Sequence, residues 1–180
     1  MTTTPETQTS ERQEQATAAQ VGPIRDLIYE SCGIYVPETR FRFLEERCTR
    51  RMAALHTESL MQYFSHLTSY AGRASEMKCL LNEITVGETC FFRNQAQLEA
   101  LRSVVIPGVV ARRKGQGLQQ LRIWSAGCST GEEAYTLAIL LAELGGILKS
   151  WTFEILATDL NENSVSRAKK AYTASTLCAI

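Results

Sequence analysis

Hydrophobic positions in the first half of the chain recur at intervals of three and four residues. This spacing is typical of helices that bury one face and expose the other. It predicts four successive helices: the first from about residue 21 to just before Gly33, the second from after residue 38 to about residue 55, the third over residues 60–70, and the fourth from about residue 74 to residue 84. Helices that follow one another in this way pack into a small core. We therefore expect an all-helical domain over residues 21–84.

The pattern changes after residue 120. Leu121, Ile123 and Trp124 predict a short strand, and a run of small residues from Ala126 to Gly131 predicts a turn. Helical spacing resumes at Tyr135 and ends at a pair of glycines, residues 145 and 146. A second strand is predicted up to residue 159, followed by a helix from about residue 161. Strand, glycine turn and helix are the first unit of a nucleotide-binding α/β sheet.

Two further segments complete the organisation. Residues 85–120 are expected to form a linker and a connecting helix, residues 95–114, with a kink at Pro107 and Gly108. Residues 1–20 are rich in Thr, Gln and Glu and have little to bury, so we expect a disordered tail. The remaining segment, residues 121–180, holds the α/β part.

Composition narrows the class of protein. The 180 residues are 44% hydrophobic and 21% charged, as in globular proteins, and the formal net charge is zero. Bulk charge therefore gives no support to nucleic-acid binding, and no apolar run is long enough for membrane insertion. Six cysteines without a CxxC pair and only two histidines argue against a metal site. We expect reduced thiols and a cytoplasmic protein.

The start of the helix after the glycine turn indicates the kind of ligand. Ser129 with Glu132, or Thr130 with Glu133, has the spacing of a capping box. A pyrophosphate would be repelled by the two carboxylates in this first turn. A ligand with an ammonium and a sulfonium group, S-adenosylmethionine (SAM), suits them better than NAD. The alternative is that Glu132 and Glu133 only stabilise the helix end.

Asp159 stands at the end of the second predicted strand. An acidic residue at this position binds ribose hydroxyls in nucleotide-binding folds. It is also placed to cap the helix that follows, and one carboxylate can serve both purposes.

Three ordered segments carry a resemblance to a known family. ITVGETCFFRN (residues 84–94), WSAGCSTGEEAYTLAI (124–139) and ATDLN (157–161) resemble the CheR-type chemoreceptor methyltransferases over about residues 21–173. The resemblance implies a helical domain followed by a class I, Rossmann-like SAM-methyltransferase domain. It implies SAM-dependent O-methylation of glutamate side chains on methyl-accepting chemoreceptors, in chemotaxis or an alternative chemosensory pathway.

The resemblance also assigns site residues. Thr89 and Arg93 are expected to reach the SAM site, with Arg93 as the catalytic residue beside the substrate carboxylate. Many family members have Asn at the Gly87 position, so here a side-chain contact is lost or replaced by backbone. The expected cofactor-binding set is Gly87, Thr89, Arg93, Gly127, Glu132, Glu133 and Asp159.

The chemistry expected of Arg93 is positioning. A carboxylate is already ionised and SAM is already activated, so methyl transfer needs no general base and depends on alignment. A guanidinium can hold the accepting carboxylate in place. The alternative for Arg93 is a surface ion pair with Glu88 or Glu99.

A basic face on the second predicted helix is the candidate partner-binding surface. Arg40, Arg47 and Arg51 share this face. In the family this helix faces the acidic methylation helices in the cytoplasmic part of the receptor, which an arginine face would attract. The alternative is a solvated face without a partner.

The α/β part is short for its class. Doubly wound sheets need more than two strands, and the later strands of the family are absent, so we expect a C-terminally truncated or split methyltransferase with an incomplete SAM domain. Two other functions stay open. One is a non-catalytic receptor-binding module, and the other is a class I methyltransferase acting on a small molecule or nucleic acid.

Overall fold

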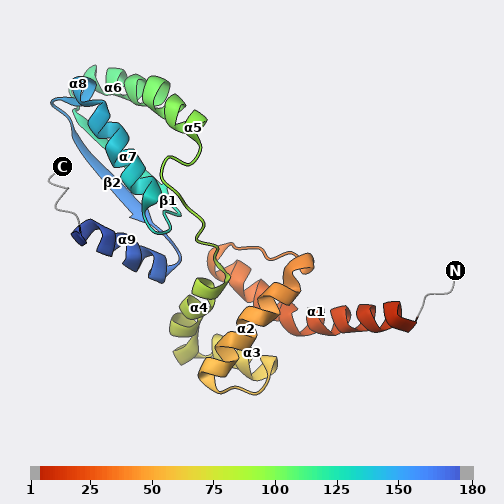
Figure 1. The fold of residues 1–180 in the computed structure, drawn as a ribbon. Coiled ribbons are helices and arrows are strands. Elements are labelled where there is room, and N and C mark those ends of the chain that lie inside the picture. The colour runs from red at the N-terminus through yellow and green to blue at the C-terminus, as the bar shows by residue number, and fades with distance from the viewer. Residues whose placement is uncertain (1–4, 175–180) are drawn as a thin grey trace. The chain divides into compact units, whose positions relative to one another are not determined.

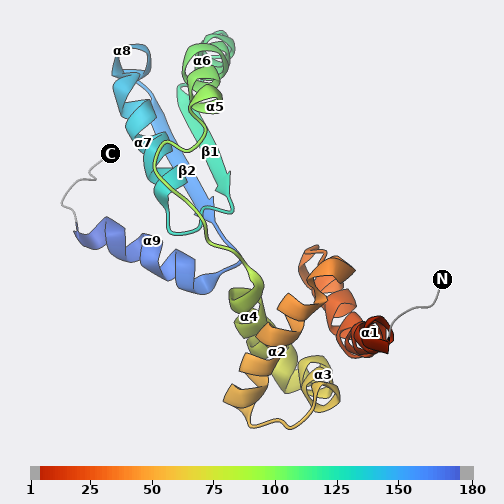
Figure 2. The ribbon, with the colours of Figure 1, turned by 45° about the vertical axis from the view of Figure 1, so that its right-hand side comes forward.

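The computed structural model describes residues 5–174, with side chains for residues 19–70 and 72–170. The chain divides into two compact units, Met1–Thr85 and Val86–Ile180, each with its own core (Figures 1 and 2). The first unit is all-helical and the second is an incomplete Rossmann-like unit, so the predicted fold class is confirmed. Residues 86–120, which belong to the predicted linker and connecting helix over residues 85–120, are part of the second unit.

Four helices and one short turn build the described part of the first unit. They are α1 (Pro5–Cys32), a 3₁₀ turn (Glu38–Arg40), α2 (Phe41–Leu55), α3 (Leu60–Thr68) and α4 (Tyr70–Ile84). Their apolar faces meet in one core, whose fully buried members include Ile24, Ile28, Leu44, Tyr63 and Leu80. The helical spacing in the sequence therefore identifies this core correctly.

The first helix is longer than the hydrophobic pattern predicts. α1 begins at Pro5, inside the segment expected to be disordered, rather than near Val21. No glycine interrupts residues 5–20, and Glu, Gln and Ala favour helix. Extending a helix that is already nucleated by a packed segment costs far less than starting one, which explains the additional turns.

Ser69 sets the boundary between α3 and α4. Ser69 is both the C-cap of α3 and the N-cap of α4. As the N-cap, its Oγ accepts a hydrogen bond from the N–H of Gly72 at 3.0 Å. α4 consequently begins at Tyr70, four residues before the position that the apolar spacing predicts.

The second unit alternates helices and strands. Its elements are α5 (Gln95–Ala100), a π-helical turn (Leu101–Val105), α6 (Ile106–Lys114), β1 (Gln120–Ala126), α7 (Glu132–Glu143), α8 (Gly145–Leu148), β2 (Thr152–Thr158) and α9 (Glu162–Ala174). β1 and β2 are parallel, with Gln120 opposite Thr152 and Ala126 opposite Thr158. The predicted strand–turn–helix–strand unit is therefore present.

Only one face of this two-stranded sheet is covered among the described residues. Ile123 of β1 and Ile155 of β2 pack against a core formed mainly by α6 and α7. On the other face the side chains of Trp124 and Leu156 are 67% and 52% exposed. Parallel sheets are normally covered on both faces, so this sheet is incomplete for its class.

The connecting helix is distorted one turn earlier than predicted. Pro107 lies in the first turn of α6, and the irregularity is the π-helical turn Leu101–Val105 before it. Proline lacks an N–H and its ring crowds the carbonyl four residues earlier, which here belongs to Ser103. A widened turn relieves that crowding, so the chain continues as helix on both sides.

Candidate functional site

The turn between β1 and α7 folds over the end of β2. The N–H groups of Gly127 and Cys128 both donate to the carbonyl of Thr158, at 2.7 and 2.9 Å. Gly127 and Gly131 adopt positive φ angles of 83° and 102°, which side chains disfavour. At Gly131 a Cβ would also lie 3.0 Å from the Cβ of Ala168, so glycine is required there for two reasons.

The predicted capping box at the start of α7 is wrong. The N-cap is Gly131, and no side chain caps the helix. Thr130 instead donates through Oγ1 to Oε2 of Glu132 at 2.7 Å. Because Gly131 is left-handed, the helix begins only at Glu132, and Glu132 and Glu133 occupy its first two positions. Both carboxylates therefore lie at the positive end of the helix dipole.

Asp159 connects the glycine turn to the start of α9. Its Oδ2 accepts from the N–H of Ser129 at 2.8 Å, and its Oδ1 accepts from the N–H of Asn161 at 2.7 Å. The N-cap of α9 is Asn161, whose Oδ1 accepts from the N–H of Ser164 at 3.1 Å. Asp159 thus supports the helix start indirectly. A carboxylate has about four acceptor positions, so it retains capacity for a ligand.

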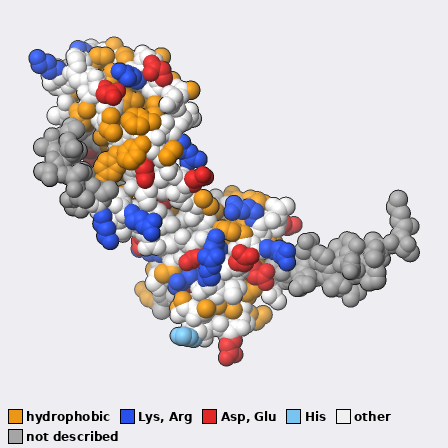
Figure 3. All heavy atoms as spheres, viewed as in Figure 1, with side chains coloured by type: hydrophobic (Ala, Val, Ile, Leu, Met, Phe, Trp, Pro, Cys, Tyr) orange, Lys and Arg blue, Asp and Glu red, His pale blue; other side chains and the backbone are white. Residues whose placement is uncertain are grey.

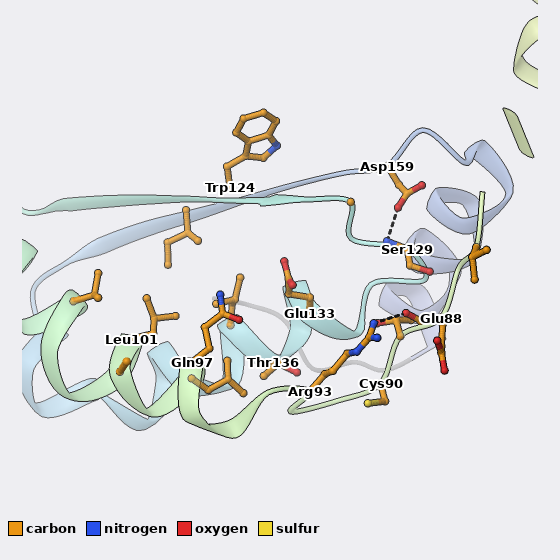
Figure 4. Close-up of a pocket in the computed structure, with 18 residues that line it drawn as sticks. Glu88, Cys90, Arg93, Gln97, Leu101, Trp124, Ser129, Glu133, Thr136 and Asp159 are labelled. Carbon is orange, nitrogen blue, oxygen red and sulfur yellow. Dashed lines mark hydrogen bonds between the residues drawn. The ribbon is translucent and has the colours of Figure 1, made fainter. Parts of the chain in front are cut away.

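A pocket of about 610 Å³ lies beside the glycine turn, within the second unit. It brings together residues far apart in the sequence, as Figure 4 shows for several of them. The predicted site residues that line it are Thr89, Arg93, Gly127, Glu133 and Asp159.

Two predicted cofactor-binding residues do not line this pocket. Gly87 lies next to it, and its carbonyl accepts from Oγ of Ser129 at 3.0 Å. A Cβ at Gly87 would come within 3.2 Å of that same Oγ, so the absence of a side chain permits the close approach. Glu132 uses its carboxylate locally, with Thr130.

Arg93 reaches the pocket from the segment before α5. Its Nη1 donates to the main-chain carbonyl of Glu88 at 2.8 Å (Figure 4). Among the described residues Arg93 forms no ion pair, so neither alternative partner, the carboxylate of Glu88 or of Glu99, neutralises it. The guanidinium charge is therefore available to a ligand.

Glu133 points from α7 toward β1 (Figure 4). Its Oε1 accepts a hydrogen bond of 2.6 Å from Oγ of Ser125, which is almost fully buried. Sequence reasoning missed Ser125. The available signal was a serine at the inward position of β1, two residues after Ile123, where alternation predicts an apolar side chain.

Thr136 was also missed, and Ser129 was expected only as a helix cap. The Oγ1 of Thr136 accepts from the N–H of Phe92 at 3.1 Å and donates to the carbonyl of Glu132 at 2.6 Å. Thr136 is 2% exposed on the apolar face of α7, and a polar residue there was the signal in the sequence. Both hydroxyls attach residues 87–93 to the glycine turn and to α7.

Cys128 is the buried thiol of the glycine turn. Burial raises its pKa above the ordinary value of a thiol, and the negative charge of Asp159 adds to the shift. The thiol therefore stays protonated near neutral pH, which makes it a poor nucleophile.

Two arginines of the first unit stack on one ring. Arg40, at the end of the 3₁₀ turn, and Arg47, in α2, each hold their guanidinium carbon 4.6 Å from the centroid of Phe43. Nε of Arg47 is buried and has no hydrogen-bond partner. In Figure 3 basic side chains gather over the α2 region, with acidic side chains among them.

Arg51 does not share that surface. Its Nε and Nη2 donate to the two carboxylate oxygens of Glu76, at 2.8 and 2.9 Å. Glu76 is 3% exposed and also accepts from the hydroxyl of the buried Tyr63 at 2.9 Å. The hydrogen bonds to Glu76 raise the pKa of Arg51. This geometry counts against Arg51 as a receptor-binding residue, because its charge already serves an internal ion pair.

The described part of the chain holds no group of three or more His, Cys, Asp or Glu side chains arranged for a metal ion. Its cysteines, Cys32, Cys48, Cys79, Cys90 and Cys128, are free thiols. None of its helices combines the length and the apolar character needed to cross a membrane.

Comparison with known proteins covers both units. Residues 21–85 match the family model described as "CheR methyltransferase, all-alpha domain", and residues 87–180 match "CheR methyltransferase, SAM binding domain". The two matches meet at the boundary between the structural units.

Curated relatives agree with this assignment. "Chemotaxis protein methyltransferase 2" of Vibrio cholerae is 33% identical over 144 residues, which are 80% of this chain and 49% of the relative. A protein of the same name in Pseudomonas aeruginosa is 33% identical over 147 residues, 82% of this chain and 49% of the relative. The "Probable chemotaxis protein methyltransferase" of Rhizobium etli is 32% identical over 152 residues, 84% and 56% respectively. The chain spans about half the length of these relatives. With both family models matched in order along the sequence, the chain belongs to the CheR methyltransferase family.

Proposed function

We propose that the chain takes part in SAM-dependent O-methylation of glutamate side chains on methyl-accepting chemoreceptors in the cytoplasm. The observation that carries this proposal is the pocket in which Arg93 lies with the carboxylates of Glu133 and Asp159. An acidic pocket with one guanidinium suits a cationic cofactor and an anionic acceptor. The relatives named as chemotaxis protein methyltransferases support the coarser statement, methyl transfer in chemotaxis.

The residues of the pocket fit SAM. Gly127 lines it, and a Cβ added there would meet no protein atom within 4 Å, so the glycine leaves open space beside its backbone. Glu133 would attract the positive charges of the cofactor, and Asp159 would accept hydrogen bonds from its ribose. Thr89 offers a hydroxyl on the same lining. When bound, SAM supplies an activated methyl group.

Arg93 would orient the accepting glutamate. Its Nη1 is held by the carbonyl of Glu88, and a guanidinium has five donors, so several remain for a carboxylate. The accepting glutamate is ionised at neutral pH and needs no proton removed. The role of Arg93 is therefore to align the accepting carboxylate, and the reaction needs no general base.

On the first unit we assign the receptor contact to Arg40 and Arg47. Their contact with the Phe43 ring restricts the motion of both guanidinium groups, which reduces the entropy lost when a carboxylate binds. Arg51, the third arginine on the basic face that the sequence predicts, is engaged by Glu76. An acidic receptor helix is attracted to such a surface over several ångströms, and salt weakens that attraction.

Calorimetry with S-adenosylhomocysteine tests the cofactor assignment. We expect the chain to bind it and Arg93→Ala to weaken binding, because Arg93 also belongs to the proposed cofactor-binding set and its guanidinium can hold the carboxylate of the ligand. Arg122→Ala is the matched control, because Arg122 lies on β1 in an exposed ion pair with Glu154 and does not line the pocket. Equal affinities of the two variants would remove Arg93 from the cofactor-binding set.

Transfer of a tritiated methyl group from SAM to receptor fragments tests the reaction itself. A base-labile label on a protein glutamate is expected. A label on a small molecule or nucleic acid would favour another class I methyltransferase. Binding of the receptor fragment without any label would favour a non-catalytic receptor-binding module.

A further inference from the structure

Residues 87–93 carry Thr89 and Arg93 but belong to no helix or strand. A segment without regular structure does not hold a side chain in place by itself. Here two hydroxyl groups fasten it near its ends. Oγ of Ser129 donates to the carbonyl of Gly87 at 3.0 Å, and the N–H of Phe92 donates to Oγ1 of Thr136 at 3.1 Å.

The hydroxyl of Thr136 has a fixed direction. It donates to the carbonyl of Glu132 at 2.6 Å, so its single proton is used and it faces Phe92 as an acceptor. Thr136 is 2% exposed, and water has little access to replace it. The segment is thus joined to the first turns of α7, the helix that also carries Glu133.

The backbone around Arg93 depends on such support. Phe92 has φ 55° and Asn94 has φ 68°, a left-handed conformation that is unfavourable for Phe and better tolerated by Asn. It persists where the surroundings determine it. The hydrogen bond from Phe92 to Thr136 fixes the first of these two residues, and Asn94 accepts from the N–H of Gln97 at 3.3 Å. Arg93 lies between them.

Ser129 joins the same network from the other end. Its N–H donates to Asp159 and its hydroxyl donates to Gly87, so the acidic residue, the glycine turn and the segment form one connected set. Any shift of the segment would move Arg93 relative to Glu133 and Asp159 together.

We propose that Thr136 is a positioning residue of the methyltransferase site, with Ser129 as its counterpart at Gly87, and that it acts by holding Arg93 in place. The inference rests on the proposed function, since it concerns the alignment of Arg93 with the cofactor and acceptor. Thr136 itself does not react. Its contribution is the single hydrogen bond to Phe92.

The test compares Thr136→Val, which keeps the shape and removes the acceptor, with Thr136→Ser, which keeps it. Ser103→Ala is the control, because the hydroxyl of Ser103 also donates to a carbonyl four residues earlier in a helix, at an exposed position. Ser129→Ala provides a second variant if Thr136→Val does not fold.

The first readout is amide hydrogen exchange over residues 87–94 in the chain without ligand. We expect Thr136→Val to accelerate exchange there by about tenfold, the loss expected for one hydrogen bond. Thr136→Ser should restore protection, and Ser103→Ala should leave it as in the original chain. Ser129→Ala should accelerate exchange toward Gly87. Unchanged exchange in both Thr136→Val and Ser129→Ala would overturn the proposal.

The second readout is affinity for S-adenosylhomocysteine in the background of Arg93→Ala. If Thr136 acts through Arg93, Thr136→Val weakens binding by about tenfold in the original chain and has little further effect once Arg93 is removed. An equal loss in both backgrounds would show that Thr136 acts independently of Arg93 and refute the proposal. If the original chain does not bind the ligand, the cofactor assignment fails, and the exchange measurement still decides whether Thr136 holds the segment.

Discussion

The ion pair inside the first unit gives the sharpest test of the structure. Arg51 and Glu76 form two hydrogen bonds of 2.8 and 2.9 Å, and Tyr63 adds a third to the same carboxylate. The perturbation is Arg51→Met, which keeps the length and apolar stem of the side chain and removes its charge. Among the described residues, it leaves the buried carboxylate of Glu76 with the hydroxyl of Tyr63 as its one remaining side-chain partner.

The expected cost follows from the burial of the pair. Removing one partner of a buried ion pair destabilises a protein by about 3–5 kcal/mol. The side chain of Arg51 is 21% exposed, so water can partly solvate what remains, and we expect about 3 kcal/mol. The matched control is Arg50→Met, one residue earlier on α2. Arg50 contacts Glu83 at 3.5 Å in an exposed pair, worth at most about 1 kcal/mol.

Urea unfolding followed by far-UV circular dichroism measures the difference. With a slope of about 1–3 kcal/mol per molar urea, Arg51→Met should lower the midpoint of the helical transition by about 1–3 M. Both tryptophans lie in the second unit, so tryptophan fluorescence reports that unit alone. The double variant Arg51→Met with Glu76→Gln should recover part of the loss, because no buried charge is left unpaired.

The reasoning is refuted if Arg51→Met costs no more than Arg50→Met. In that case the charge of Arg51 would be available to a receptor helix, as its position on the basic face of the second predicted helix suggests.

Three further measurements test other parts of the structure. Burial, helped by Glu45, raises the pKa of Cys48 from 9.0 to about 12, so unfolding releases a proton between these values. Stability should hold below pH 9 and fall above it by up to about 1.4 kcal/mol per pH unit, and Cys48→Ala should flatten the decline in urea titrations. Both glycines have a positive φ, so Gly127→Ala and Gly131→Ala should each lower the melting temperature, and Gly131→Ala should lower it more because its Cβ is also crowded. Gly127→Ala should in addition weaken S-adenosylhomocysteine binding measured by calorimetry, because Gly127 lines the pocket. At pH 8 a thiol reagent should label the exposed Cys90 before the buried Cys48, as peptide mapping by mass spectrometry would show.

Much of the fold is predictable because hydrophobic periodicity is a local property. The helical core around Ile28 and Leu44 and the strand–turn–helix unit follow from spacing alone. The limits of the elements are harder, since they depend on single groups. α4 starts early because Ser69 caps it, and the predicted capping box fails because Gly131 takes a left-handed conformation.

The site is predictable where a motif determines the residue and unpredictable where the partner is distant in the sequence. Thr89, Arg93 and Asp159 lie in segments whose resemblance identifies them, and they line one pocket. The partner of Thr136 lies 44 residues earlier and that of Arg51 lies 25 residues later. A helical wheel shows which residues share a face, and it contains no information about the helix that packs against that face.

The uncovered face of the sheet carries Trp124, an intrinsic fluorescence probe. The indole N–H of Trp124 is anchored to the hydroxyl of Thr158 at 3.0 Å while most of its ring is in water, whereas Trp151 is buried. The emission of Trp124 should therefore be red-shifted, and in a Trp151→Phe variant it becomes the whole signal. Any polypeptide that comes to rest on β1 and β2 would shift that emission to the blue, so association at this face can be followed without a label.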